Sequence, residues 1–480
     1  MAGTYSRTTD VLVIGGGPGG YMAAIRLGQL GRPTLLVERD ALGGECLNRG
    51  CIPSKALIHL ATLLDAVRTE GPEVGLHTTG EVQLDLVVAQ QWKESVVAKE
   101  RQGVASLLKS AGTAVLPGTV RFTGPRSAEL TAPDGGKERI DFEHAIIATG
   151  AVQASLRGFE PDGARVDTAY DVLNWTSLPK SLLVLGGGVS GCELGEFAAM
   201  AGSQVTIVEL MPQLLPGMDP DLSRELTRRL EGRGVKVLTG IKAVALERTV
   251  EGVRLTVEKD GKKGDLSAER LFVTVGKKPA TQELGLEEAG VERDGKTGFI
   301  PVNDRLATNV PHIYAVGDCC RPPMLAHKAY REGVVAAESI AGLPTRFQFQ
   351  AMPSVVFTIP ELATVGLTAP EAQTAGFVAR DVRFPYAALG RAHASHATDG
   401  WVKLVADEKT GIVLGFQGAG TGVGELVGEV ALAIEMGATV RDLALTIHPH
   451  PTFSELLQEV ALLWLGEPMH VARRTAARPS

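Results

Sequence analysis

The sequence contains two copies of one pattern, and this repeat restricts the fold more than any other feature. Residues 11–38 and residues 182–209 align without a gap. Each copy has an apolar run, a glycine-rich turn, a helical stretch, a second apolar run and a final glutamate. This order of strand, turn, helix and strand is that of a βαβ unit. The repeat therefore predicts an α/β fold with two Rossmann-like dinucleotide-binding domains.

The glycine spacing in both copies is typical of a dinucleotide-binding turn. The first glycine allows a tight bend, the second lets the backbone approach a pyrophosphate, and the third lets the helix pack on the strand. The helix N-terminus stabilises the phosphate charge, and the closing carboxylate accepts hydrogen bonds from ribose hydroxyls. The predicted residues are Gly15, Gly17, Gly20 and Glu38 in the first copy, and Gly186, Gly188, Gly191 and Glu209 in the second. Two complete copies favour two cofactors that exchange electrons over two glycine-rich turns of an ordinary α/β fold.

The glutamate that closes the second copy indicates which nicotinamide is used. A carboxylate at Glu209 repels a 2′-phosphate, and residues 210–215 contain no arginine to receive one. We therefore expect NAD rather than NADP at the second site.

Composition and charge exclude several functional classes. The 480 residues suggest about three domains, and a net charge of −7 without a lysine or arginine block argues against nucleic-acid binding. No uncharged apolar run reaches about 18 residues, so no membrane insertion is expected. Residues 1–10 are polar and lack an apolar signal core, and five cysteines are too few for a disulfide scaffold. A cytoplasmic location is expected.

Two of the cysteines, Cys46 and Cys51, lie close together in the segment GGECLNRGCIPSKAL. Pro53 and the apolar-periodic run after it predict a helix start, where the helix dipole stabilises a thiolate. Lys55 adds positive charge one turn on, and Gly50 gives the backbone freedom to bring the two sulfur atoms within bonding range. Two buried free cysteines or half a metal site are alternatives. No further cysteine or histidine lies at short spacing, so no metal is expected.

The other three cysteines are predicted to be structural. Cys192 lies in the helix of the second βαβ unit and is expected to pack in the core. Cys319 and Cys320 are adjacent, and neighbouring cysteines seldom bridge comfortably.

The segment from Gly43 to Lys55 closely resembles the active-site signature of the class I pyridine-nucleotide disulfide oxidoreductases. These flavoenzymes include dihydrolipoamide dehydrogenase, glutathione reductase and mercuric reductase. The resemblance extends from about residue 8 to about residue 465, and its motifs are highly specific. It implies that FAD binds at the first repeat and NAD at the second. It also implies that Cys46 and Cys51 form a redox disulfide, with Cys46 as the sulfur that exchanges with a dithiol and Cys51 next to the flavin.

Further residues match the family's cofactor-binding positions. The segments HAIIATGA, TNVPHIYAVGD and MLAHKA are similar to its flavin-contacting motifs. The resemblance implies FAD contacts, in addition to those above, from Lys55, Val120, Thr149, Gly150, Asp318, Met324, Leu325, Ala326 and His327. It implies that Ala243 and Gly276 contact NAD, and that Glu193 pairs with Lys55 at the cofactor site. From the sequence alone, a solvated helix position for Glu193 is an equally open interpretation.

The segment HPHPTFSE near the C-terminus resembles the family's catalytic base motif. The pattern falls on His450, Pro451, Thr452 and Glu455. A thiol must lose its proton to attack a disulfide, and an imidazole held by a carboxylate is suited to accept it near neutral pH. His448 is expected to be secondary and structural, and Pro449 replaces the small residue usual between the two histidines.

The resemblance also implies the domain organisation. We expect an FAD-binding domain in residues 1–150, an NAD-binding domain in 151–276, a central domain completing the FAD site in 277–348, and a C-terminal interface domain in 349–480. We predict α+β order in that last domain, because three strand patterns (SVVFTI, WVKLVAD, GIVLGFQG) are followed by two helical patterns (GELVGEVALAIEMG, SELLQEVALLWLG). In the family the active site is shared across a homodimer. His450 and Glu455 would therefore serve the cysteines of the second chain.

Within the family, the motifs look most like those of the dihydrolipoamide dehydrogenases, the enzymes that oxidise dihydrolipoyl groups with NAD⁺. Glu209 argues against an NADP-linked glutathione reductase, and the end of the chain lacks the cysteine pair usual in mercuric reductase. The implied partner is a lipoyl-bearing acyltransferase or carrier of a 2-oxoacid dehydrogenase complex. A reductase of another disulfide remains an alternative, as does a non-catalytic flavoprotein subunit of a multienzyme complex.

Overall fold

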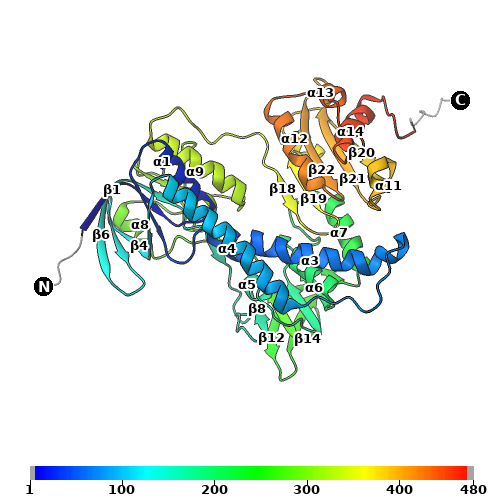
Figure 1. Ribbon diagram of the computed structural model, residues 1–480, viewed down its shortest axis with the longest axis horizontal. Coiled ribbons are helices and arrows are strands. Elements are labelled where there is room, and N and C mark those ends of the chain that lie inside the picture. The colour runs from blue at the N-terminus through cyan, green and yellow to red at the C-terminus, as the bar shows by residue number, and fades with distance from the viewer. Residues whose placement is uncertain (1–5, 473–480) are drawn as a thin grey trace.

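The computed structural model of the protein describes residues 6–472. Figure 1 shows two α/β bodies joined by the long helices α3 and α4, with a third body formed by the C-terminal residues. The mixed α/β class predicted from the repeat is confirmed.

The first body is built on a sheet with the strand order β3-β2-β1-β6-β5-β4. Strands β1, β2 and β6 are parallel, and helix α1 connects β1 to β2 as the first copy of the repeat predicts. Strand β17 comes from residues far along the chain and pairs with β6, so the central region completes this sheet. The elements are β1 (Ser6–Ile14), α1 (Pro18–Gln29), β2 (Thr34–Glu38), β3 (Ala114–Pro117), β4 (Thr119–Gly124), β5 (Ser127–Thr131), β6 (Lys137–Ile147), α8 (Leu286–Ala289), β17 (Ile313–Ala315) and α9 (Ala326–Ile340).

The second body repeats the arrangement in a five-stranded parallel sheet of order β11-β10-β9-β15-β8. An antiparallel sheet β12-β13-β14 flanks it, and a two-stranded pairing of β7 with β16 connects it to the first body. The elements are β7 (Ala151–Gln153), β8 (Val166–Asp167), α5 (Ala169–Val172), β9 (Ser181–Leu185), α6 (Val189–Ala201), β10 (Gln204–Glu209), α7 (Pro220–Gly232), β11 (Lys236–Thr239), β12 (Lys242–Arg248), β13 (Val253–Lys259), β14 (Lys262–Ala268), β15 (Arg270–Val273) and β16 (Lys277–Pro279).

The helices that carry the cysteine pair lie between these two bodies. They are α2 (Gly44–Arg49), α3 (Cys51–Thr69) and α4 (Leu86–Ser110), and α3 packs against both α4 and α6. Among the described residues, the stretch Gly44–Thr69 is long and apolar enough to cross a membrane by length and composition alone, which the sequence analysis did not expect. Its buried residues, including Leu57 and Ala61, belong to the core shared with the second body.

The C-terminal body is an antiparallel sheet of order β18-β19-β22-β21-β20 with helices packed on it, which confirms the predicted α+β order. The patterns of three strands and two helices were predicted, whereas β19 and β20 were not. Lys403 of β21 is buried and pairs with Asp219 and Asp221 at the start of α7, which attaches this body to the second one. The elements are β18 (Ser354–Val356), β19 (Leu362–Gly366), α10 (Ala369–Thr374), β20 (Ala379–Pro385), α11 (Gly390–Ala394), β21 (Trp401–Asp407), β22 (Val413–Ala419), α12 (Val423–Glu435), α13 (Val440–Leu445) and α14 (Glu455–Leu465).

Candidate active site

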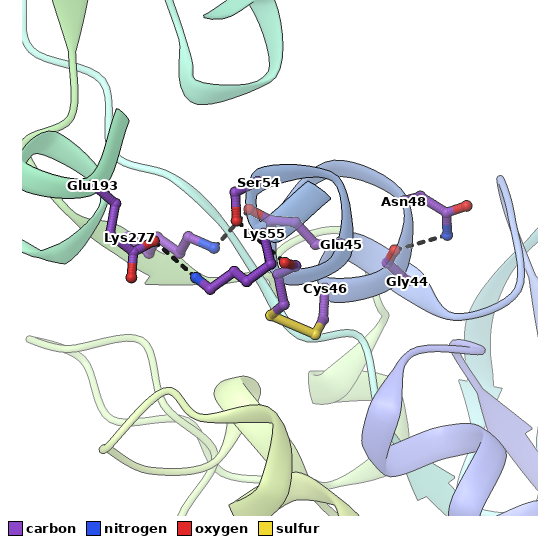
Figure 2. The surroundings of a disulfide bond; sticks show 9 residues. Gly44, Glu45, Cys46, Asn48, Ser54, Lys55, Glu193 and Lys277 are labelled. Atoms are coloured by element: carbon purple, nitrogen blue, oxygen red, sulfur yellow. Dashed lines mark hydrogen bonds and ion pairs between the residues drawn. A yellow bond between two sulfur atoms is a disulfide. The ribbon is translucent and has the colours of Figure 1, made fainter. Parts of the chain in front are cut away.

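Cys46 and Cys51 are joined by a disulfide, and their Cα atoms lie 4.8 Å apart (Figure 2). Cys46 lies on the short helix α2, and Cys51 is the first residue of α3. The sequence predicted that this helix starts at Pro53, but α3 begins two residues earlier, at Cys51. Pro53 is accommodated there because a proline is tolerated in the first turn of a helix. The position of Cys51 exposes its sulfur to the positive end of the α3 dipole.

Gly44 allows helix α2, which carries Cys46, to pack closely against the first glycine-rich turn. Gly44 has a φ of +60°, and a Cβ atom there would lie 2.6 Å from the Cα of Gly17. A side chain at this position would therefore separate α2 from the turn. This close backbone approach places the disulfide beside the first glycine-rich turn.

Lys55 and Glu193 form an ion pair between α3 and α6, with Nζ and Oε2 2.8 Å apart (Figure 2). Only 4% of Glu193 is exposed, so the alternative of a solvated helix residue is wrong. The other carboxylate oxygen accepts a hydrogen bond from the backbone N–H of Phe357 at 2.9 Å, and the Phe357 ring lies 4.5 Å from the Lys55 Nζ. This arrangement fixes a cation one turn beyond Cys51.

A second ion pair at the disulfide was not predicted from the sequence. Lys277 Nζ lies 2.6 Å from Oε1 of Glu45, the residue before Cys46 (Figure 2). The two side chains come from β16 and α2, which are far apart in the sequence. No local pattern signals such a contact, since only the folding of the second body against the first brings the residues together.

The glycines of the first turn separate into two kinds. Gly15 has a φ of +104°, and a Cβ atom on Gly20 would overlap the carbonyl oxygen of Gly15, so both are required by the fold itself. A Cβ atom on Gly17 would lie 3.7 Å from Gly44 and clash with nothing in the chain. The space above Gly17 at the start of α1 therefore suits a ligand that approaches the backbone, such as a pyrophosphate.

The second turn repeats this geometry. Gly186 has a φ of +114°, and a Cβ atom on Gly191 would overlap the Gly186 carbonyl oxygen. A Cβ atom on Gly188 would meet no atom within 4 Å. Packing within the described residues therefore does not require glycine at position 188, and the open space there also fits a pyrophosphate.

The two closing glutamates are oriented in the same way. Glu38 accepts hydrogen bonds from the N–H groups of Gly16 at 2.6 Å and Asp40 at 2.8 Å. Glu209 accepts from Gly187 and Met211, both at 2.6 Å. Burial raises the pKa of Glu38, and the N–H of Gly16 opposes this effect. Each carboxylate is thereby held next to the turn at which a ribose would lie.

Several residues predicted to contact FAD lie around the first turn. Thr149 Oγ1 donates to the carbonyl of Ala280 at 2.7 Å, and Gly150 takes a φ of +70°, so the turn after β6 is fixed against the chain that follows β16. Burial raises the pKa of Asp318, while Lys277 and Lys328 lower it. Its carboxylate therefore lies in a partly desolvated site that favours a hydroxyl donor.

The remaining predicted contact residues are positioned by secondary structure. Val120 is a buried residue of β4, and Ala243 lies at an irregularity in the pairing of β12 with β13. Gly276 has a φ of +113° and accepts a hydrogen bond from Ala154. In the segment from Met324 to His327, α9 begins at Ala326 with Leu325 as its N-cap residue, and the His327 Nε2 lies 2.9 Å from the Pro353 carbonyl.

His450 and Glu455 form the predicted pair, with Nδ1 and Oε1 2.8 Å apart. The His450 side chain is 75% exposed, and across the described residues no hydrogen bond or ion pair joins it to either cysteine of its own chain. His448 is buried by contrast, between Glu429 at 3.0 Å and the Thr446 carbonyl at 3.0 Å. The structure therefore separates an exposed histidine held by a carboxylate from a structural one.

The other cysteines are free and buried, as predicted. Burial raises the pKa of the Cys192 thiol, which donates to the Gly187 carbonyl, and of the Cys319 and Cys320 thiols. Within residues 6–472, no group of three or more histidine, cysteine or acidic side chains is placed to hold a metal ion.

Two family models match the chain. The model described as pyridine nucleotide-disulphide oxidoreductase matches residues 9–333, which is more than half of the chain. The model of that family's dimerisation domain matches residues 352–461. Together they cover both nucleotide-binding bodies and the C-terminal body.

Curated relatives match over nearly the whole chain. A protein of Thermus scotoductus is 45% identical over 471 residues, which is 98% of this chain and 100% of the relative. One of Haloferax volcanii is 43% identical over 479 residues, which is 99% of this chain and 100% of the relative. Both relatives bear the name dihydrolipoyl dehydrogenase.

Solved structures share the fold as well. LpdA from Mycobacterium tuberculosis superposes with a TM-score of 0.87 at 28% identity, over 95% of this chain and 99% of that one. The copper(II) complex of the HOCl-induced flavoprotein disulfide reductase RclA from Escherichia coli superposes with a TM-score of 0.84 at 27% identity, over the same shares.

Proposed function

The chain belongs to the pyridine nucleotide-disulphide oxidoreductase family, and we propose that it oxidises dihydrolipoyl groups to lipoyl groups with NAD⁺. The enzyme is an NAD-dependent flavoprotein whose cofactors are FAD and NAD. The observation that carries the proposal is the Cys46–Cys51 disulfide at the start of α3, beside the first of two dinucleotide turns and next to the Lys55–Glu193 pair.

The residues fit both cofactors. Gly15, Gly17 and Gly20 with Glu38 would hold FAD, and the equivalent residues of the second turn, Gly186, Gly188, Gly191 and Glu209, would hold NAD. When bound, FAD would supply two-electron chemistry between the thiol centre and the nicotinamide, and NAD would supply the hydride acceptor. The chain supplies the orientation, through the glycine turns, and the electrostatics.

The thiol chemistry falls to the two cysteines. A deprotonated sulfur of the substrate attacks Cys46, which forms a mixed disulfide and releases Cys51 as a thiolate. The second substrate sulfur then displaces Cys46 and leaves as part of the oxidised dithiolane. Cys46 and Cys51 re-form their disulfide as two electrons leave toward the flavin side. The substrate thus loses two electrons and two protons, and its first proton is accepted by a base.

The base is the partner subunit's His450. In its own chain His450 is exposed and held by Glu455, without a bond to the cysteines. The carboxylate orients Nδ1 and stabilises the imidazolium that forms when Nε2 takes a proton. The cation of Lys55 favours the thiolate of Cys51 one turn away.

The chain carries the family's dimerisation domain and forms a homodimer. Large apolar side chains are exposed on the C-terminal body close to the segment that carries His450, which supports a contact surface there. They are Leu432, Met436, Leu445 and Ile447. We place the shared active site at this surface, with each subunit contributing the base for the other's disulfide.

The natural substrate is a lipoyl group carried by an acyltransferase or carrier of a 2-oxoacid dehydrogenase complex, and the enzyme acts in the cytoplasm. The name of the curated relatives and their near-complete coverage support this assignment. The likeness to RclA, at 27% identity, supports the reductase of another disulfide as a second candidate function.

The test is NADH formation from NAD⁺ and dihydrolipoamide by the purified yellow protein. NADP⁺ replaces NAD⁺ in one control, and Cys51→Ser replaces the wild type in another. NAD-specific turnover that the variant loses supports the proposal and excludes a non-catalytic subunit. A yellow protein that oxidises NADH but ignores dihydrolipoamide would contradict it, and oxidised glutathione and mercuric ion would then be tested as substrates.

A further inference from the structure

Two buried carboxylates on one face of α6 hold the same short segment of the C-terminal body. Glu193 accepts a hydrogen bond from the Phe357 N–H at 2.9 Å. Glu196, one helical turn further on, accepts one from the Ile359 N–H, also at 2.9 Å. Only 1% of Glu196 is exposed. Residues three apart on a helix lie on the same face, so segment 357–360 is attached to α6 at two points.

Arg233, which directly follows α7, holds the same residue from its other side. Its Nη1 donates to the Ile359 carbonyl at 2.7 Å and lies 3.3 Å from Glu196 Oε1. Its Nη2 donates to Asp65 of α3 at 3.1 Å. Ile359 is therefore bound through both its N–H and its C=O, and the arginine connects it to the helix that begins at Cys51.

This segment is also what packs against Lys55. The Phe357 ring lies 4.5 Å from the Lys55 Nζ, and the Phe357 N–H occupies one oxygen of the carboxylate that pairs with Lys55. A shift of the segment would remove the ring and release Glu193 to turn. The position of the cation beside Cys51 therefore depends on how firmly segment 357–360 is held.

We propose that Glu196 and Arg233 are positioning residues for the Cys46–Cys51 centre, because they fix segment 357–360 against α6 and α3 and thereby hold Lys55 in place. In the described part of the chain, no hydrogen bond or ion pair joins either of them to the disulfide. Their effect on the thiols passes through Lys55.

The environment of Glu196 is consistent with a function of this kind. Burial raises the pKa of its carboxyl to about 7, Arg233 opposes the rise, and Asp65 and Glu193 add to it. Desolvation of a carboxylate costs stability that an apolar side chain would not lose. The hydrogen bond to Ile359 and the pairing with Arg233 are what the carboxylate provides at this site.

The test measures the reactivity of Cys46 in the dithiol-reduced holoenzyme. Iodoacetamide alkylation is followed by mass spectrometry from about pH 5 to about pH 9. We expect Glu196→Ala to move the midpoint of this profile upward by about one pH unit, since a displaced Lys55 stabilises the thiolates less. Amide hydrogen exchange at Phe357 and Ile359 should rise by at least about tenfold.

Two further variants make the test specific. Arg233→Met removes the donor to the Ile359 carbonyl, should have the same effects, and decides the matter where Glu196→Ala does not fold. Asp167→Asn is the matched control, because Asp167 is buried and paired with Arg270 in the same body, and among the described residues no hydrogen bond or ion pair joins it to the segment. It should lower stability and leave both readouts unchanged.

Folded variants at Glu196 or Arg233 with the alkylation profile of the wild type would overturn the inference and leave these residues a purely structural role. The inference rests on the proposed function only in that it takes Cys46 and Cys51 as the redox centre. Neither readout uses a lipoyl substrate. A wild-type enzyme that fails to oxidise dihydrolipoamide would therefore contradict the proposed function without deciding this one.

Discussion

Glu455 holds the imidazole of His450 by its Nδ1 at 2.8 Å, while three quarters of the histidine side chain faces solvent. The pair has the geometry of an oriented base, yet within residues 6–472 the imidazole makes no hydrogen bond or ion pair except with this carboxylate. This geometry supports the proposal that a second copy of the chain completes the site.

Complementation between two inactive variants tests this arrangement. Cys51→Ser and His450→Gln homodimers should each be inactive. When they are co-expressed, about half of the dimers are mixed, and each mixed dimer has one intact site of two, so about a quarter of the wild-type activity should return. NADH formation per flavin is the measurement. If the disulfide and the base belonged to one chain, the mixture would stay inactive.

The base itself should affect only the dithiol half of the reaction. His450→Gln is expected to lower kcat/KM for dihydrolipoamide by about 100-fold to 10,000-fold, because proton transfer from the attacking thiol is lost. Glu455→Gln should cause a smaller loss, since the imidazole keeps a hydrogen-bond partner. Oxidation of NADH by a one-electron dye should be unchanged in both variants. A fall in the dye reaction would mean that His450 acts on the nucleotide side.

Alanine variants of the middle glycines, Gly17 and Gly188, should show which turn binds FAD and which binds NAD. The new Cβ atom of Gly188→Ala would have no atom of residues 6–472 within 4 Å, so the variant should fold, keep its flavin and raise the KM for NAD⁺ by about tenfold or more. Gly17→Ala should instead be purified with little flavin. Visible absorbance and NAD⁺ titration provide the two readings. A Gly188→Ala enzyme with unchanged KM would remove the second turn from the NAD site.

As a contrast, Gly191→Ala places a Cβ atom into the Gly186 carbonyl. This variant should lose soluble expression or melt well below the wild type, whatever cofactor is present. Equal behaviour of the Gly188 and Gly191 variants would show that packing, and not the ligand, selects glycine at both positions.

Glu196 should make stability depend on pH. Its folded pKa of about 7 lies above the value of about 4.3 in an unfolded chain. Folding therefore takes up a proton between these values, and the contribution of this group to stability falls as the pH rises from about 4.3 to about 7. Glu196→Gln does not titrate, so its melting temperature relative to the wild type should increase from about pH 5 to about pH 8. A constant difference would argue against the raised pKa.

The sequence was sufficient for elements whose signals are local. The apolar runs and glycine spacings predicted β1, α1 and β2, and again β9, α6 and β10, because a tight turn and a helix start depend on neighbouring residues. The Cys46–Cys51 pair was implied by the resemblance of the local segment to the family's signature, since the residues alone left two free cysteines open. The sequence missed β19 and β20, which pair with β22 and β21 in the folded chain.

Contacts between distant residues were decided by the tertiary structure alone. Lys277 meets Glu45, and Glu196 meets Ile359 and Arg233, across bodies that no local pattern relates. By itself the sequence predicted two dinucleotide turns, and its resemblance to the family implied a redox-active cysteine pair and a histidine held by a carboxylate. The folded chain decided that the partly exposed lysine beside the disulfide pairs with the buried Glu193 and packs against Phe357, and that the histidine faces outward. The physical reason is that glycine turns and helix starts are set by the backbone of a few residues, whereas burial and pairing of charges depend on which surfaces the whole chain brings together.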